Sequence, residues 1–151
     1  MKQKFYHYKA DTESLFFEFT SVSEEKTISK IITYSPLPDD PEIYNLALGD
    51  ILLNGEVSDL TVSNNSDMEK VIATVVRTIF NFFEKHPENA IYFKGSSPER
   101  TRLYRIIISK ELNEAQKLFN FYGIINGNLE YFSQNRPYQA FIITLKDDNN
   151  L

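Results

Sequence analysis

The feature that most constrains the fold is an amphipathic segment in the middle of the chain. Apolar side chains recur at helical intervals between residues 68 and 83. Ser66 and Glu69 have the spacing of a capping box, and Pro87 disfavours helical conformation at the residue before it. The pattern predicts one long helix over residues 67–85 that packs one face against a sheet.

Short apolar segments lie on both sides of this helix and predict strands. They are rich in Phe, Tyr and β-branched residues, and Asn54-Gly55 and Asn126-Gly127 are typical two-residue hairpin turns. The predicted strands cover residues 5–9, 15–22, 27–34, 42–48, 51–53, 57–62, 90–94, 121–125, 128–132 and 138–145. The order predicts an α+β fold with an antiparallel or mixed sheet of about six to eight strands and helices mainly on one face.

One or two shorter helices are expected in the second half of the chain. Ser97 is a natural N-cap, and Pro98 suits the first helical position. Residues 102–109 fit a helix or a strand, because Ile106-Ile107-Ile108 suits both periods, and the cap favours the helix. Residues 112–119 predict a further short helix.

The length and the charge set the scale of the protein. A chain of 151 residues is enough for one domain with its own core and too short for two ordinary ones. We expect a single α+β domain over residues 1–146 and a polar tail at 147–151 that frays. The net charge of −5 divides into −7 over residues 1–93 and +2 over residues 94–151, so the basic character is local.

The composition excludes several classes of chemistry. The chain has no Cys, which rules out disulfides, thiolate catalysis and Cys-based zinc or iron–sulfur sites. Its first residues lack the apolar region of a signal peptide, and no apolar run approaches the roughly 20 residues that span a membrane. We expect a cytoplasmic protein without membrane contact. Nucleic acid is a disfavoured partner, because a net acidic protein binds it poorly without specific contacts.

One basic segment departs from what a plain fold requires. An apolar run ends at a Gly-Ser-Ser-Pro turn, and one lysine and three arginines surround that turn. Cations and hydroxyls beside a helix N-terminus suit a phosphate, a nucleotide or a nucleic-acid backbone. The residues of this candidate anion site are Lys94, Ser96, Ser97, Arg100, Arg102 and Arg105.

The same segment has a purely structural interpretation. Ser97 and Pro98 can simply start a helix whose arginines pair with carboxylates inside the fold. The known phosphate-loop templates do not apply, since the spacing of a P-loop is absent and Gly95 is the only glycine of the segment. Basic residues in a first helical turn oppose the helix dipole, so a partner inside or outside the fold is expected to neutralise them.

The other polar clusters are better explained by structure. His7 and His86 lack the nucleophile and the orienting acid of a catalytic arrangement. One oxygen-rich stretch has no calcium-loop spacing and is explained by turn and cap chemistry. Its residues are Asp50, Asp59, Asn64, Asn65 and Asp67. We therefore predict no catalytic residue, no metal site and no cofactor.

Aromatic residues on the predicted strands allow a different binding mode. They could stack bases, as sheet-based single-strand binders do, but alternating aromatic residues are more often the core face of a sheet. These residues are Tyr6, Tyr8, Phe17, Phe19 and Tyr34.

Four fragments occur in a familiar order along the chain. They are Leu48-Gly49-Asp50, residues 64–71, residues 95–105 and Tyr138-Gln139-Ala140-Phe141, and the most specific is Gly-Ser-x-x-x-Arg-Thr-Arg-Leu-Tyr from Gly95. Their order resembles an uncharacterised family of small single-domain bacterial proteins, classed as a domain of unknown function. The resemblance covers nearly the whole chain. It implies one domain and brings no activity, cofactor or catalytic residue.

We therefore hypothesise a non-enzymatic binding or interaction domain with an anion-recognising basic patch. One alternative is an enzyme that acts on a phosphate-bearing substrate, with the same basic residues as a clamp. Another is a toxin-like or antitoxin-like protein whose patch meets an acidic surface of a protein partner. A homodimer through an exposed sheet edge is compatible with each of these.

Overall fold

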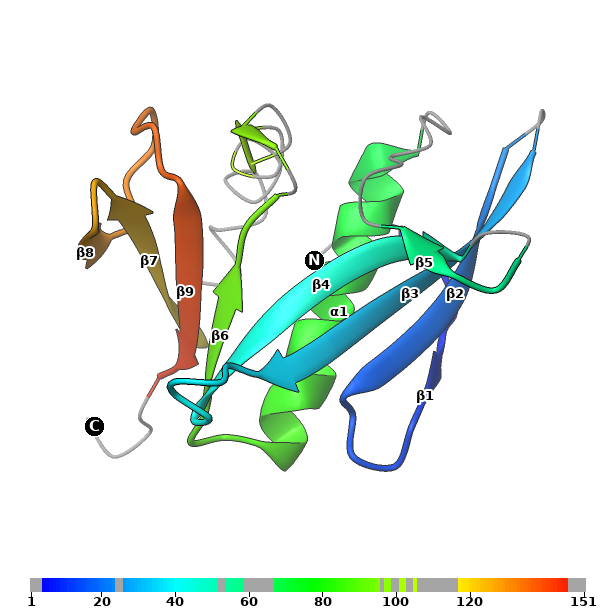
Figure 1. Cartoon of the computed structure of the whole chain (residues 1–151), viewed down its shortest axis with the longest axis horizontal. Coiled ribbons are helices and arrows are strands. Elements are labelled where there is room, and N and C mark those ends of the chain that lie inside the picture. Colours follow the sequence, from blue (N-terminus) through cyan, green and yellow to red (C-terminus); the bar gives the residue numbers. More distant parts are fainter. Residues whose placement is uncertain are drawn as a thin grey trace. The chain divides into compact units, whose positions relative to one another are not determined.

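A computed structural model describes residues 4–23, 26–51, 54–58, 67–95, 97–98, 101–102, 105 and 117–146. Over these residues it delineates nine strands and one helix (Figure 1). The elements are β1 (Lys9–Ala10), β2 (Phe16–Val22), β3 (Thr27–Pro36), β4 (Ile43–Ile51), β5 (Val57–Ser58), α1 (Met68–Lys85), β6 (Ala90–Phe93), β7 (Phe119–Ile125), β8 (Asn128–Tyr131) and β9 (Ala140–Leu145).

The chain divides into two compact units. We call Lys2–Ser35 with Leu46–His86 the helical unit, and Pro36–Asn45 with Pro87–Leu151 the C-terminal unit. β4 contributes residues to both. The single domain expected over residues 1–146 stays a prediction.

The helix α1 has the bounds that its periodicity predicts. The Val71 N–H donates to the Asp67 carbonyl at 2.9 Å, and Asp67 is the N-cap. The Asp67 carboxylate makes no capping bond, because it accepts hydrogen bonds from the hydroxyls of Tyr6 and Ser21, each at 2.5 Å. The capping box was expected to begin at Ser66, which lies outside the described residues, whereas the observed cap is one residue later.

Aromatic side chains form much of the core of the helical unit. α1 lies on one face of β2 and β3 (Figure 1), where the Tyr34 ring stacks on Phe82 with centroids 4.7 Å apart. The Tyr34 hydroxyl shares a hydrogen bond of 2.8 Å with Thr78 Oγ1. Tyr8 is half-buried and its hydroxyl donates to Asn81. The residues considered for base stacking are otherwise buried, which assigns them to the core; they are Tyr6, Phe17, Phe19 and Tyr34.

A buried ion pair joins β3 to the neighbouring strand β4. Lys30 Nζ lies 2.5 Å from Asp50 Oδ1, and the two side chains are only 5% and 6% exposed. The assignment of Asp50 to turn chemistry was therefore wrong, because the residue lies within β4 and serves as a buried counter-ion.

Both predicted hairpin turns are present. Asn126 and Gly127 have φ angles of +51° and +79°, the left-handed values of a type I′ turn, and they join the antiparallel strands β7 and β8. Gly55 has φ +87° between β4 and β5, which also pair antiparallel.

In the C-terminal unit the strands follow the order β4, β6, β9, β7, β8. The Ala90 N–H donates to the Glu42 carbonyl at 3.2 Å, so β6 starts beside the start of β4, and the two run in the same direction (Figure 1). β9 is antiparallel to both of its neighbours, β6 and β7. The predicted α+β class with a mixed sheet is therefore confirmed.

The shorter helices are not matched as predicted. Lys117 and Leu118 form a turn and Phe119 begins β7, so the helix expected over residues 112–119 is wrong at that end, because strand pairing with β9 overrides the local pattern. Residues 111–116 lie outside the described part. Of residues 98–110, those that are described are helical, namely Pro98, Thr101, Arg102 and Arg105, but the rest are not described and no second helix is delineated.

Candidate functional site

The basic segment lines a pocket in the C-terminal unit. The pocket has a volume of about 570 Å³. One wall is made by the described residues of the segment that follows β6, and the other by residues 137–139 just before β9. Its described lining residues are Lys94, Gly95, Ser97, Pro98, Thr101, Arg102, Arg105, Pro137, Tyr138 and Gln139.

The first wall is held by a turn around Thr101. The Thr101 N–H donates to the Ser97 carbonyl at 3.0 Å, which is the hydrogen bond of one helical turn, and Pro98 is the first helical residue after Ser97. Thr101 is buried, and its hydroxyl oxygen accepts a hydrogen bond of 3.0 Å from the Gly95 N–H. This bond joins the segment after β6 to the helical turn, and both of its residues line the pocket.

Three cations face this pocket. Lys94 and Arg102 are exposed, and over the residues that the structure describes neither has a hydrogen-bond acceptor or an ionic partner. Arg105 is partly buried, and its Nη1 donates to the Arg136 carbonyl at 2.5 Å. The structural interpretation, with arginines paired to carboxylates inside the fold, is therefore not what the described part shows for Arg102.

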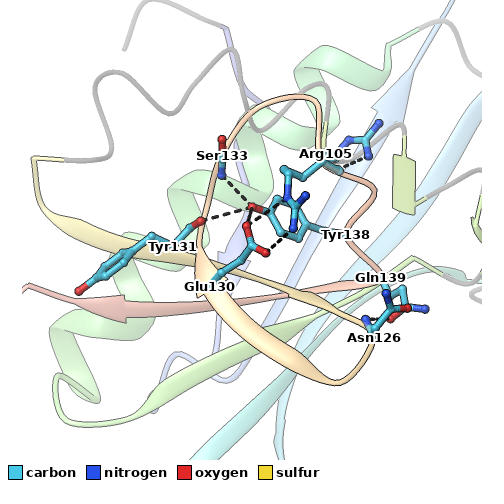
Figure 2. A network of polar contacts seen from close by, with 8 residues as sticks. Arg105, Asn126, Glu130, Tyr131, Ser133, Tyr138 and Gln139 are labelled. Carbon is cyan, nitrogen blue, oxygen red and sulfur yellow. Dashed lines mark hydrogen bonds and ion pairs between the residues drawn. The ribbon is translucent and has the colours of Figure 1, made fainter.

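The second wall depends on the buried ring of Tyr138. Its hydroxyl accepts a hydrogen bond of 2.9 Å from the Ser133 N–H and donates to Glu130 Oε2 at 3.0 Å. Figure 2 shows these groups converging on the phenol oxygen. The ring lies directly against Gly123 of β7, where an added Cβ would be 2.2 Å from the Tyr138 ring. Burial raises the pKa of Tyr138 and keeps the phenol neutral.

An ion pair braces the loop that carries this wall. Arg136 contacts Glu130 through two bonds, Nη2 to Oε1 at 2.7 Å and Nε to Oε2 at 3.2 Å. Hydrogen bonds from Arg136 lower the pKa of Glu130. Because the Arg136 carbonyl also accepts from Arg105, this ion pair connects one wall of the pocket to the other.

Gln139 presents a fixed amide beside the pocket. Its Oε1 accepts a hydrogen bond of 2.9 Å from the Asn126 N–H (Figure 2). The backbone N–H of Gln139 donates to the Ile124 carbonyl at 2.8 Å. An N–H donor requires an oxygen acceptor, so this contact settles which end of the amide faces Asn126. The NH₂ group is thereby left as the donor of the side chain.

The amino-acid sequence matches a known protein family over most of its length. A model of a family of unknown function, DUF6934, matches residues 2–146. The chain belongs to this family. The resemblance to an uncharacterised family is thus confirmed. A search of curated proteins and a search of solved structures each find no match.

Membership of DUF6934 carries no activity with it, so the function rests on the site. Of the six predicted residues the structure brings four to one pocket, Lys94, Ser97, Arg102 and Arg105. Ser96 and Arg100 lie outside the described residues.

Sequence reasoning missed the second wall of the pocket in this DUF6934 chain. Tyr138 and Gln139 were predicted to begin a strand, whereas β9 begins at Ala140, and Pro137 was given no role. The pairing of β9 with β6 brings these residues beside Lys94, and no local pattern encodes that pairing. Thr101 was also missed, although a Thr four residues after an N-cap is within reach of the capping carbonyl.

The two histidines have structural or exposed positions, and Asp59, Asn64 and Asn65 of the oxygen-rich stretch lie outside the described residues. His86 is the C-cap of α1, and its Nε2 contacts the Glu13 carbonyl at 2.8 Å. His7 is exposed. Within the described residues no group of three or more His, Asp or Glu side chains could hold a metal ion. No helix in that part of the chain is long and apolar enough to cross a membrane.

Proposed function

We propose that this protein is a non-enzymatic binding domain whose pocket holds a phosphate-bearing anion. The observation that carries the proposal is the charge of the lining. Lys94, Arg102 and Arg105 line the same pocket, and none of its described lining residues is acidic. The charged groups of the described lining are therefore all positive, in a protein whose net charge is −5.

Electrostatics supports a bound anion over an empty site. A single exposed ion pair contributes only about 0–1 kcal/mol, so the attraction for an anion would come from several cations acting on it together. Lys94 and Arg102 have no anionic partner in the described part of the fold, so an external anion would supply one. An arginine also binds a phosphate through two parallel hydrogen bonds, which adds orientation to charge.

The lining favours binding over catalysis. A general base would have to lie within hydrogen-bond reach of the substrate. The described lining contains no carboxylate and no imidazole, and the Tyr138 hydroxyl is already engaged by Ser133 and Glu130. An enzyme acting on a phosphate-bearing substrate remains the alternative, with a base contributed from outside these residues.

The test is a pair of charge-matched double variants. Lys94→Ala with Arg102→Ala is expected to weaken pyrophosphate binding, measured by isothermal titration calorimetry at low salt, at least about tenfold, or about 1.4 kcal/mol. The melting temperature should change by less than about 2 °C, because both side chains are exposed. Lys117→Ala with Lys146→Ala is the control, since it removes the same charge from exposed residues outside the pocket lining.

The two double variants separate a site from general attraction. Equal weakening in both would mean that pyrophosphate responds to net charge alone, and the proposed pocket site would be abandoned. A large loss of thermal stability in the Lys94 and Arg102 variant alone would show instead that these cations hold the fold together.

A further inference from the structure

The pocket is larger than an inorganic anion requires. Its volume of about 570 Å³ lies inside the range of about 300–1,000 Å³ that is typical of small-molecule and cofactor sites. A water molecule takes about 30 Å³ of the liquid, so a phosphate with a few waters would leave most of this space unfilled. The volume therefore favours a ligand in which an organic group is joined to the anion.

The lining combines charged and apolar groups. Apart from the cations Lys94, Arg102 and Arg105, it contains the rings of Pro98, Pro137 and Tyr138. Proline and tyrosine rings offer flat apolar surface with little entropy to lose on binding. A ligand that is anionic at one end and ring-like at the other would match both parts.

Gln139 adds a polar group to the lining, next to Pro137 and Tyr138 in the sequence. The Asn126 N–H occupies its Oε1, so the amide is oriented in advance and its NH₂ can donate to a ligand oxygen. A fixed donor of this kind confers specificity on a largely apolar surface. Nucleobases and sugars both carry suitable oxygen acceptors.

We infer that the pocket takes a phosphate ester of about mononucleotide size. Its phosphate contacts Lys94 and Arg102, and its ring packs against Pro98 and Pro137, with the Gln139 amide as a hydrogen-bond donor. The inference rests on the proposed anion site and adds the size and chemical class of what that site binds.

The test titrates the full chain with three kinds of probe. They are inorganic phosphate, the four common ribonucleoside monophosphates, and the same nucleosides without phosphate. At least one monophosphate should bind about tenfold more tightly than inorganic phosphate, because it also buries its ring. The nucleosides should bind far more weakly than their monophosphates, because they lack the charge that Lys94 and Arg102 recognise.

Each outcome has a distinct consequence. If inorganic phosphate binds as tightly as every monophosphate, the mononucleotide inference is overturned while the anion site stands. If neither phosphate nor any monophosphate binds, the proposed function fails as well. Nucleosides that bind as tightly as their monophosphates would remove the role assigned to the cations.

A second pair of variants tests the apolar wall alone. Pro98→Ala with Pro137→Ala should weaken the monophosphate several-fold and leave inorganic phosphate binding unchanged. Pro38→Ala with Pro41→Ala is the control, because these prolines are exposed and lie outside the pocket lining. Equal monophosphate binding by wild type and both variants would contradict the ring contact.

Discussion

The two units of this protein treat positive charge in opposite ways. In the helical unit Lys30 is only 4% exposed, and Asp50 lies 2.5 Å from its ammonium group. In the C-terminal unit Lys94 and Arg102 are exposed at a pocket and have no acceptor in the described part. A buried cation needs a counter-ion within the fold because its desolvation is costly, whereas an exposed cation is solvated by water and can bind an anion from solution. The difference separates charge used for structure from charge available to a ligand.

Tyr34 and Tyr138, one buried tyrosine from each unit, differ in the groups that their hydroxyls contact. Burial raises the pKa of Tyr34 in the helical unit, and its hydroxyl meets the neutral Thr78. The Tyr138 hydroxyl meets the carboxylate of Glu130 instead, which is itself held by Arg136. The Tyr138 hydroxyl is thus held by a charged brace, whereas the Tyr34 hydroxyl is held by a neutral one.

Removing the buried counter-ion should have the largest effect. Asp50→Ala removes the carboxylate that lies 2.5 Å from the buried Lys30 ammonium, so we expect a loss of about 3–5 kcal/mol in the free energy of unfolding. Urea denaturation followed by circular dichroism measures it. Lys30→Met with Asp50→Leu is the control, because replacing both charges by apolar groups should recover most of the loss. A loss below about 1 kcal/mol for Asp50→Ala would erase the contrast between the units.

The next effect should come from the contact beneath the pocket wall. Gly123→Ala places a Cβ 2.2 Å from the Tyr138 ring, and the ring must move. Overpacking of this kind costs about 1–3 kcal/mol, and it should also weaken pyrophosphate binding by shifting the wall. A double-mutant cycle with Tyr138→Ala checks the cause, because Gly123→Ala should cost much less once the ring is gone. Additive losses would show that the ring is not what Gly123 accommodates.

A smaller and more selective effect should follow from one charge in the pocket. Gln139→Glu keeps an oxygen for the Asn126 N–H but replaces the NH₂ donor by a negatively charged acceptor. We expect unchanged stability and pyrophosphate binding weakened about tenfold, or about 1.4 kcal/mol. Gln134→Glu makes the same charge change at an exposed residue that does not line the pocket. If both variants bind alike, Gln139 does not face the anion.

Local chemistry made the fold class and half of the site predictable. The 3.6-residue period predicted α1, and Asn126-Gly127 predicted a hairpin because both residues tolerate positive φ. Ser97 and Pro98 likewise predicted the helical turn that positions Thr101.

The other half of the site depends on pairing between distant strands. β9 pairs with β6 across about 50 residues of sequence, and that pairing carries residues 137–139 to the basic segment. The periodicity of a strand's own sequence does not reveal which distant strand it pairs with. The same reason hid the role of Asp50, whose turn-like sequence context gave no sign that Lys30 would pair with it from the adjacent strand.

The smallest effect should appear in the brace between Glu130 and Arg136, and it depends on pH. Because Arg136 lowers the pKa of Glu130 in the folded protein, the pair stabilises the fold above the ordinary glutamate pKa. That contribution is lost as the pH falls through the lowered value. The melting temperature of wild type should therefore exceed that of Glu130→Gln at neutral pH, and the difference should shrink towards about pH 3.

The difference in melting temperature between wild type and Glu130→Gln should be small at every pH, because an ion pair this exposed is weak. Glu88→Gln serves as the control, since Glu88 is exposed and belongs to the same unit. Glu130 also accepts from the Tyr138 hydroxyl. If the brace holds the Tyr138 wall in place, the wild type should lose pyrophosphate binding over the same pH range in which the difference in melting temperature shrinks. A difference that is constant from neutral to acid pH would mean that Glu130 contributes through shape alone. The pocket would then resemble the helical unit, with its walls fixed by packing and its cations alone left to recognise the ligand.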